Sequence, residues 1–180
     1  MKPADKQAAS IKWGIELETR IPLRQLNNGL CVGGYHCGLP VRTGLDVQSG
    51  HALIAPHFKG ELWKAERDGS ITCDADQSPC EFVSPILHRE DGVEHLIKFV
   101  EWLNAIGASV NHSCGCHITV GVESVIGSKQ PEKVSEFVRK LAHIAQWHAM
   151  SLYGQTGTGR HLNRTATRLP PTWSATCERS

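Results

Sequence analysis

Two glutamates two residues apart, Glu16 and Glu18, are the strongest chemical feature of this 180-residue chain. They lie in the segment 11–20, IKWGIELETR, in which apolar and polar side chains alternate. A period of two is typical of a half-buried strand, on which side chains two apart share a face and lie roughly 6.5–7 Å apart. The segment therefore predicts a strand with an apolar face and a carboxylate face. Such a carboxylate face is either a solvated surface or a platform for a divalent cation.

Two further acidic positions follow along the chain. Asp68 and Ser70 flank a glycine in the segment 61–73, which we interpret as a hairpin with its tip at Asp68-Gly69. Glu81 lies in the short apolar run 80–83, a predicted strand in which an unpaired carboxylate is costly to bury. Each position also has a purely structural interpretation, as a turn or as an exposed strand residue.

A histidine completes the set. His117 belongs to the predicted strand 116–122, where it shares a face with Thr119, while Ile118 and Val120 point the other way. Taken alone, His117 is equally well explained as a structural histidine with satisfied hydrogen bonds.

Glu16, Glu18 and Glu81 on one sheet face would create a severe electrostatic conflict. Carboxylates ~4 Å apart repel one another by about 4 kcal/mol per pair at an effective dielectric constant near 20. Either the pKa of one group rises strongly, or a cation binds between them. Oxygen ligands favour Mg²⁺, which proteins commonly bind together with a phosphate group.

The elements that must position these residues are two helices and a sheet. Apolar side chains recur at helical spacing over 90–106, which ends at Gly107, and over 131–150, which begins with Pro131. We therefore predict an α+β fold in which an antiparallel sheet has one polar, catalytic face and amphipathic helices pack on the other face. The catalytic domain is expected over 11–153, followed by an irregular tail over 154–180.

Composition excludes several classes of protein. The formal charge of +1 offers no cationic field for nucleic acid, and no apolar run reaches the ~18–20 residues that span a membrane. The first ten residues lack the apolar core of a secretion signal, so we expect a cytoplasmic protein. The seven cysteines are then most simply reduced thiols, and an open sheet edge would favour oligomers.

Four motifs in order resemble one known family. They are GIELE at 14–18, W-x4-DGS from Trp63 to Ser70, EFVSPIL at 81–87 and VNHSCGCHITVG at 110–121. Together they resemble the amidoligases, carboxylate–amine ligases of the glutamine synthetase-like fold. The resemblance implies phosphorylation of a carboxylate by ATP with Mg²⁺, after which an amine displaces the phosphate to form an amide or isopeptide bond. The implied partners are small-molecule or peptide carboxylates and amines.

The resemblance also implies residue roles. Mg²⁺ ligands are expected at Glu16, Glu18 and Glu81, catalytic roles at Glu81 and Asp68, nucleotide or phosphate contacts at His117, Thr119 and Arg160, and substrate contacts at Ser70 and Asn163. Glu81 would either complete a metal site or face the incoming amine.

Two departures from the family pattern bear on activity. Thr119 stands where the family usually has the second histidine of His-x-His, and a hydroxyl cannot replace an imidazole ligand. The chain also ends soon after Asn163, whereas complete members of the family run further. These departures favour a second hypothesis, a truncated non-catalytic remnant or binding module of the same fold.

A structural zinc site is the third hypothesis. Cys31, His36 and Cys37 form one group in the sequence. The run from His112 to His117, with two cysteines inside it, forms another. Neither group has the Cys-x2–4-Cys pairs typical of structural zinc.

Overall fold

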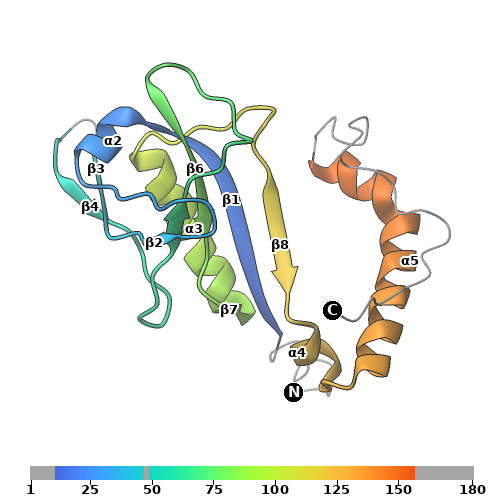
Figure 1. Ribbon diagram of the computed structural model, residues 1–180. Helices are drawn as coiled ribbons and strands as arrows, with labels where there is room; N and C mark the ends of the chain where they lie inside the picture. Colours follow the sequence, from blue (N-terminus) through green and yellow to red (C-terminus); the bar gives the residue numbers. More distant parts are fainter. Residues whose placement is uncertain (1–10, 47–48, 157–180) are drawn as a thin grey trace. The chain divides into compact units, whose positions relative to one another are not determined.

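The computed structural model describes residues 11–46 and 49–156 (Figure 1). The chain divides into two compact units, and the boundary along the sequence lies between Gly121 and Val122. The first unit holds the sheet and the second holds two helices, and each is considered separately below. The predicted α+β class with an antiparallel sheet is confirmed.

The long strand β1 (Lys12–Pro22) organises the sheet of the first unit. It pairs antiparallel with β6 (Gln77–Val83), β7 (Leu87–His88) and β8 (Cys116–Val120). On the far side of β6 follow β5 (Lys64–Glu66) and then β2 (Leu39–Pro40), also antiparallel. A separate pair is formed by β3 (Thr43–Leu45) and β4 (Ala52–Ile54), and the short helix α2 (Leu23–Asn27) follows β1.

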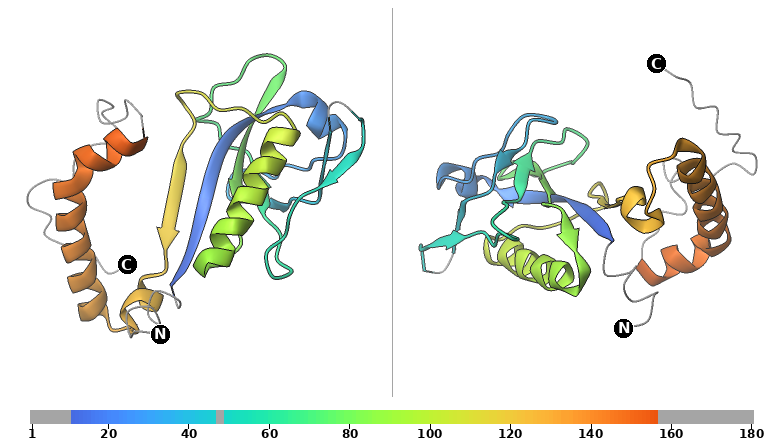
Figure 2. Two further views of the ribbon diagram at one scale, coloured as in Figure 1. Left: turned by 180° about the vertical axis from the view of Figure 1, so that it is seen from behind. Right: turned by 90° about the horizontal axis from the view of Figure 1, so that it is seen from below.

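Alternation along β1 divides the sheet into two faces. Ile15 and Ile21 are buried on one face, which helix α3 (Arg89–Ala105) covers (Figure 2). Aromatic rings fill the space between helix and sheet: Trp63 stacks on Phe99 at 3.6 Å between ring centroids, and Phe82 meets Phe99 edge-on at 5.6 Å. Such ring contacts add to the area that each side chain buries. The core therefore lies on one side of β1 and leaves Glu16 and Glu18 on the other.

The predicted hairpin over 61–73 is only partly correct. Strand β5 is present, but its partner is β6, and residues 67–76 form a long connection. The run 71–73 is no strand, because side chains supply its hydrogen bonds. The N–H of Thr72 donates to Ser113 Oγ at 3.0 Å, and the Asn111 side chain donates to the Thr72 carbonyl at 2.9 Å.

The second unit contains helix α4 (Val122–Ile126) and helix α5 (Pro131–Thr156). Helix α5 starts at Pro131 as predicted, since proline suits the first helical position, and it extends beyond the predicted end at residue 150. The predicted strand over 116–122 ends at Val120, because Val122 already belongs to α4. Packing of α5 against the sheet stays a prediction.

Within the described ranges, neither α3 nor α5 is both long and apolar enough to cross a lipid bilayer, and the same holds for the shorter helices.

Candidate functional site

Three carboxylates form a row across the open face of the sheet. The strand register places Glu18 of β1 directly opposite Glu81 of β6, and Glu81 directly opposite Glu66 of β5. Each of the three is only 7% exposed. Side chains directly opposite on antiparallel strands lie on the same face with their Cβ atoms roughly 4.5–5.5 Å apart. The fold therefore concentrates negative charge with little access to water.

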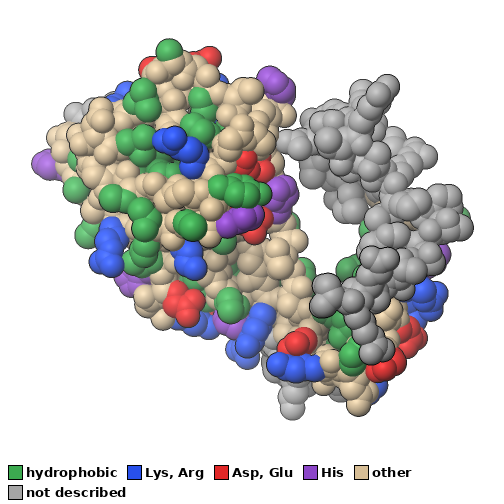
Figure 3. Space-filling view, in the orientation of Figure 1, with side chains coloured by type: hydrophobic (Ala, Val, Ile, Leu, Met, Phe, Trp, Pro, Cys, Tyr) green, Lys and Arg blue, Asp and Glu red, His purple; other side chains and the backbone are tan. Residues whose placement is uncertain are grey.

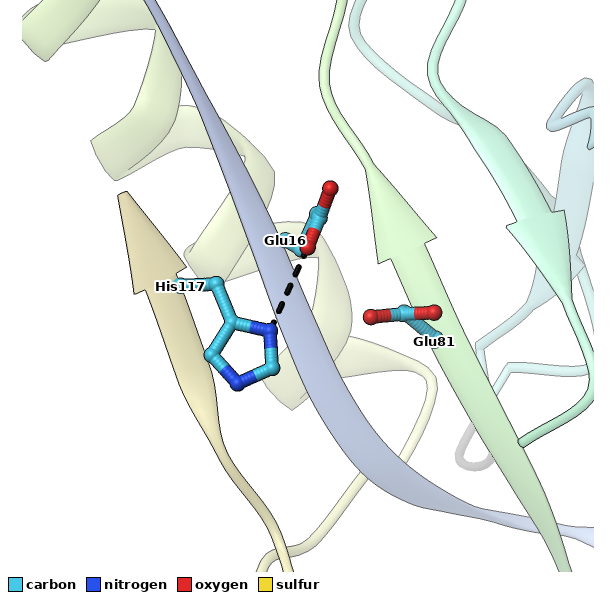
Figure 4. Close-up of side chains that lie close together, drawn as sticks. All are labelled: Glu16, Glu81 and His117. Atoms are coloured by element: carbon cyan, nitrogen blue, oxygen red, sulfur yellow. Dashed lines mark hydrogen bonds and ion pairs between the residues drawn. The ribbon is translucent and has the colours of Figure 1, made fainter. Parts of the chain in front are cut away.

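A second row lies beside the first. Glu16 of β1 is opposite His117 of β8, and His117 Nδ1 lies 3.2 Å from Glu16 Oε2 (Figure 4). The other ring nitrogen, Nε2, lies 3.8 Å from Glu18 Oε1. His117 thus contacts both glutamates of β1, and the predicted orientation of His117 and Thr119 toward this face agrees with the register.

Ligand atoms converge in two overlapping groups. One group is Glu16, Glu81 and His117, the other is Glu18, Asp68 and Glu81, and within each the ligand atoms lie within 4.8 Å of one another. Figure 3 shows acidic and histidine side chains gathered side by side over this part of the sheet. Four of the five residues in the two groups are carboxylates, a donor set that suits Mg²⁺.

The backbone of Gly115 fixes Glu18. Its N–H donates to Glu18 Oε2 at 2.6 Å, and the Glu18 N–H donates to the Gly115 carbonyl at 3.0 Å. A Cβ atom at position 115 would lie 3.0 Å from Glu18 Oε1, so a larger residue would displace this carboxylate. A charge-assisted hydrogen bond of this kind holds the side chain in one orientation.

Glu81 is the residue on which the predicted repulsion among carboxylates acts. Burial raises the pKa of Glu81 to about 7, and the charges of Glu16, Glu66 and Asp68 act in the same direction. A hydrogen bond to Glu66 also favours the protonated form of Glu81. In the absence of a cation, Glu81 therefore holds a proton near neutral pH.

The other predicted residues fall in different places. Asp68 joins the carboxylates, whereas the Ser70 N–H donates to Asp68 Oδ1 at 2.7 Å in an exposed turn. Thr119 lies opposite Gly14 in the register, one side-chain position beyond His117 on β8. Arg160 and Asn163 lie outside the described residues.

A pocket of about 280 Å³ adjoins the charged rows, next to Thr119. Trp13, Pro85 and Ile86 supply apolar surface, and Gly14 provides space because it has no side chain.

Glu66 was missed in the sequence analysis. Its carboxylate lies near His36, whose Nδ1 is 4.0 Å from Glu66 Oε1. The available signal was position: Glu66 is two residues before Asp68 and lies in a strand, so it can share the face of the other acids. The error in the predicted hairpin hid this signal, because it paired β5 with 71–73 instead of β6.

The cysteines do not assemble a zinc site in the part of the chain that the structure describes. Within those ranges, neither cluster of three metal-binding side chains contains a cysteine. Cys80 is fully buried in the core, where burial raises the pKa of its thiol, and Cys31 and Cys37 are exposed. This arrangement gives no support to the zinc hypothesis.

Comparison with models of known protein families identifies the family. A family model described as "Putative amidoligase enzyme" matches residues 10–169. The chain belongs to this amidoligase family. No curated protein and no solved structure matched the chain. Membership supports a ligase-type enzyme and covers all the residues of the two carboxylate rows in this amidoligase.

Replacing His117 with Ala is expected to weaken nucleotide binding by roughly 10-fold or more, with little change in melting temperature. His117 is largely exposed and contacts Glu16 and Glu18 rather than the core, so its loss affects the site first. Calorimetric titration with ATP and Mg²⁺, beside thermal melts, measures both effects, and the exposed His51→Ala variant is the matched control. A large fall in melting temperature with unchanged nucleotide affinity would make His117 a structural histidine.

Proposed function

We propose that this amidoligase is an ATP- and Mg²⁺-dependent carboxylate–amine ligase that forms an amide or isopeptide bond through an acyl phosphate. One observation carries the proposal: residues far apart in the sequence, from β1, β6, β8 and the 67–76 connection, converge in two overlapping ligand groups. Family membership supports the ligase class.

The donor set fits divalent cations. Glu16, Glu81 and His117 would hold one ion, and Glu18, Asp68 and Glu81 a second. When bound, Mg²⁺ would supply charge neutralisation for the transferred phosphoryl group. The buried carboxylates of the site need such neutralisation themselves, and that mutual need is the physical support for the assignment.

The reaction would proceed in two balanced steps. An oxygen of the substrate carboxylate attacks the γ-phosphorus of ATP, and ADP leaves. The amine nitrogen then attacks the acyl carbon, inorganic phosphate leaves, and the amine loses a proton. If Glu81 faces the amine instead of binding a cation, its carboxylate can receive that proton, because its pKa without a cation is about 7.

The pocket beside Thr119 supports nucleotide binding. Its apolar lining from Trp13, Pro85 and Ile86 matches the flat face of a base, and the Thr119 hydroxyl at its edge could contact a ribose or phosphate oxygen. Arg160 and Asn163 are proposed to contact phosphate and substrate on the strength of the family resemblance. The proposed substrates are small-molecule or peptide carboxylates and amines, and use of ATP suits a cytoplasmic location.

Thermal stability in the presence of ligands tests the proposal. A ligand at about 100 times its Kd stabilises a folded protein by about 2.7 kcal/mol, so millimolar ATP with Mg²⁺ is expected to raise the melting temperature by about 5–10 °C. Mg²⁺ alone should give a smaller rise, and ATP with a chelator should give almost none. Absence of any shift at millimolar nucleotide would contradict the proposal.

Thr119 favours a second candidate function, nucleotide binding without turnover. A threonine replaces the second imidazole that the family usually carries on this strand. The thermal shift would then persist, but phosphate release would not rise above background with any mixture of acids and amines. Thr119→His would be expected to restore or raise turnover if the missing imidazole is the cause.

A further inference from the structure

Two loops beside the site are tied to each other by side-chain hydrogen bonds. The connection 67–76 leads from β5 to β6, and the segment 107–115 leads from α3 to β8. Thr72 donates to Ser113 Oγ from its N–H at 3.0 Å and shares a second bond with it at 3.1 Å, while Asn111 binds the Thr72 carbonyl. These hydrogen bonds hold the two loops next to each other at Thr72 and Ser113.

A cysteine follows each of these two residues. Cys73 comes directly after Thr72, Cys114 comes directly after Ser113, and both thiols are partly buried. Burial raises the pKa of the Cys73 thiol, Arg20 lowers it, and Cys114 raises it, which places Cys114 within electrostatic range of Cys73. Neither thiol is in a disulfide in this structure.

We propose that Cys73 and Cys114 form a reversible disulfide that joins the two loops. A small-molecule disulfide such as oxidised glutathione would be the oxidant. The thiolate of one cysteine attacks a glutathione sulfur, a mixed disulfide forms, and one glutathione thiolate leaves. The thiolate of the second cysteine attacks the protein sulfur of that mixed disulfide, the protein disulfide forms, and the second glutathione leaves. Two thiol protons are released to the two departing glutathione thiolates.

Neither Cys73 nor Cys114 lies in a helix or a strand. A disulfide needs its Cα atoms roughly 4.4–6.8 Å apart, so the two loops must be adjacent and able to adjust. The run 70–76 contains no helix or strand, and the hydrogen bonds between the loops involve mainly side chains. Any adjustment that the bond needs would fall on these loops.

The other cysteines of the described residues are placed less well for this reaction. Cys80 is fully buried in the core, and Cys31 and Cys37 are exposed on a different loop. Cys116 lies opposite Leu17 in the register, on the sheet face that turns away from Glu16 and Glu18. Cys73 and Cys114 form the pair whose chain neighbours already contact each other.

The bond would act on the carboxylate site through its neighbours. Cys114 precedes Gly115, whose N–H holds Glu18, and the loop of Cys73 also carries Asp68. Oxidation would therefore restrain the segments that carry Asp68 and Gly115, and Asp68 and Glu18 belong to the same ligand group as Glu81. The disulfide itself is independent of the proposed function, whereas its effect on Mg²⁺ affinity rests on that function.

Peptide mapping tests the disulfide directly. The full chain is incubated with oxidised glutathione, blocked with an alkylating agent, and cleaved with trypsin followed by a protease that cuts before aspartate, which separates Cys73 from Cys80. We expect one cross-linked peptide pair containing Cys73 and Cys114, lighter by two hydrogens than the sum of its reduced peptides. The pair should disappear in Cys73→Ser and in Cys114→Ser, persist in the control Cys116→Ser, and disappear on treatment with a thiol reductant.

Three results would overturn the proposal. They are stable glutathione adducts on both cysteines without a cross-link, a cross-link that involves Cys80 or Cys116 instead, and bound zinc that blocks oxidation of the pair. Magnesium titration of the oxidised and reduced protein gives the second readout, with a several-fold difference in affinity expected. A confirmed cross-link with no Mg²⁺ binding in either form would leave the disulfide intact and would count against the ligase.

Discussion

Glu18→Gln is expected to lower ATP turnover by roughly 10²–10³-fold or more, and Glu16→Gln to do the same, while the protein stays folded. Each substitution keeps the shape of the side chain and removes one negative charge from a site in which carboxylates repel one another. Removing a charge from such a cluster relieves repulsion, so stability should be unchanged or higher. Activity should fall because each variant removes a charged oxygen donor from one of the two ligand groups.

Phosphate release with mixtures of carboxylates and amines measures the turnover, and a magnesium titration at fixed ATP shows whether the loss arises from metal affinity. Glu101→Gln on the exposed surface of α3 is the matched control and should behave like the unaltered protein. Near-normal phosphate release by either Glu16→Gln or Glu18→Gln would show that the carboxylate rows do not bind the catalytic metal.

The carboxylate face of β1 could be predicted from sequence because alternation is a local property. Side chains two apart on a strand must share a face. Because Ile15 and Ile21 are buried on one face, Glu16 and Glu18 must lie on the other. Alternation also predicted the face of His117, and the register confirms it, although Ile118 and Val120 on the other face of β8 are exposed.

The third strand of the row could not be predicted in this way. Which strand lies beside β6 depends on contacts between residues distant in sequence. The Asp68-Gly69 pair suggested that the strand before it pairs with residues 71–73, whereas its partner is β6. Glu66 was therefore not predicted as a site residue, although it is buried as deeply as Glu18 and Glu81. In place of a strand partner, the side chains of Asn111 and Ser113 satisfy the backbone of Thr72.

The pH dependence of stability is the second large expected effect. Without divalent cations, the folded state holds a proton on Glu81 up to about pH 7, whereas the unfolded chain releases it near pH 4.5. The folded state thus binds more protons between these pH values, so the contribution of Glu81 to stability falls as pH rises from 4.5 to 7. The loss is on the order of 3 kcal/mol, because each unit of pKa shift corresponds to about 1.4 kcal/mol.

Comparison with Glu81→Gln isolates this contribution. Denaturant unfolding at pH 5 and pH 8 in a chelating buffer should show that the variant gains stability relative to the unaltered protein as pH rises. Magnesium at pH 8 should stabilise the unaltered protein more than the variant, because only the carboxylate offers the cation a charge. Equal pH dependence in both proteins would show that Glu81 titrates normally and that its neighbours exert no net effect on it.

The backbone contact to Glu18 has a consequence for ion selectivity. The Gly115 N–H donates to Oε2, so a cation would compete with this N–H at Oε2 but not at Oε1. Calcium often takes both oxygens of a carboxylate and seven or eight donors in all, whereas a smaller octahedral ion is satisfied by one oxygen from each side chain. This hydrogen bond would therefore favour coordination of a cation through one oxygen of Glu18 and disfavour the two-oxygen contact that calcium often makes.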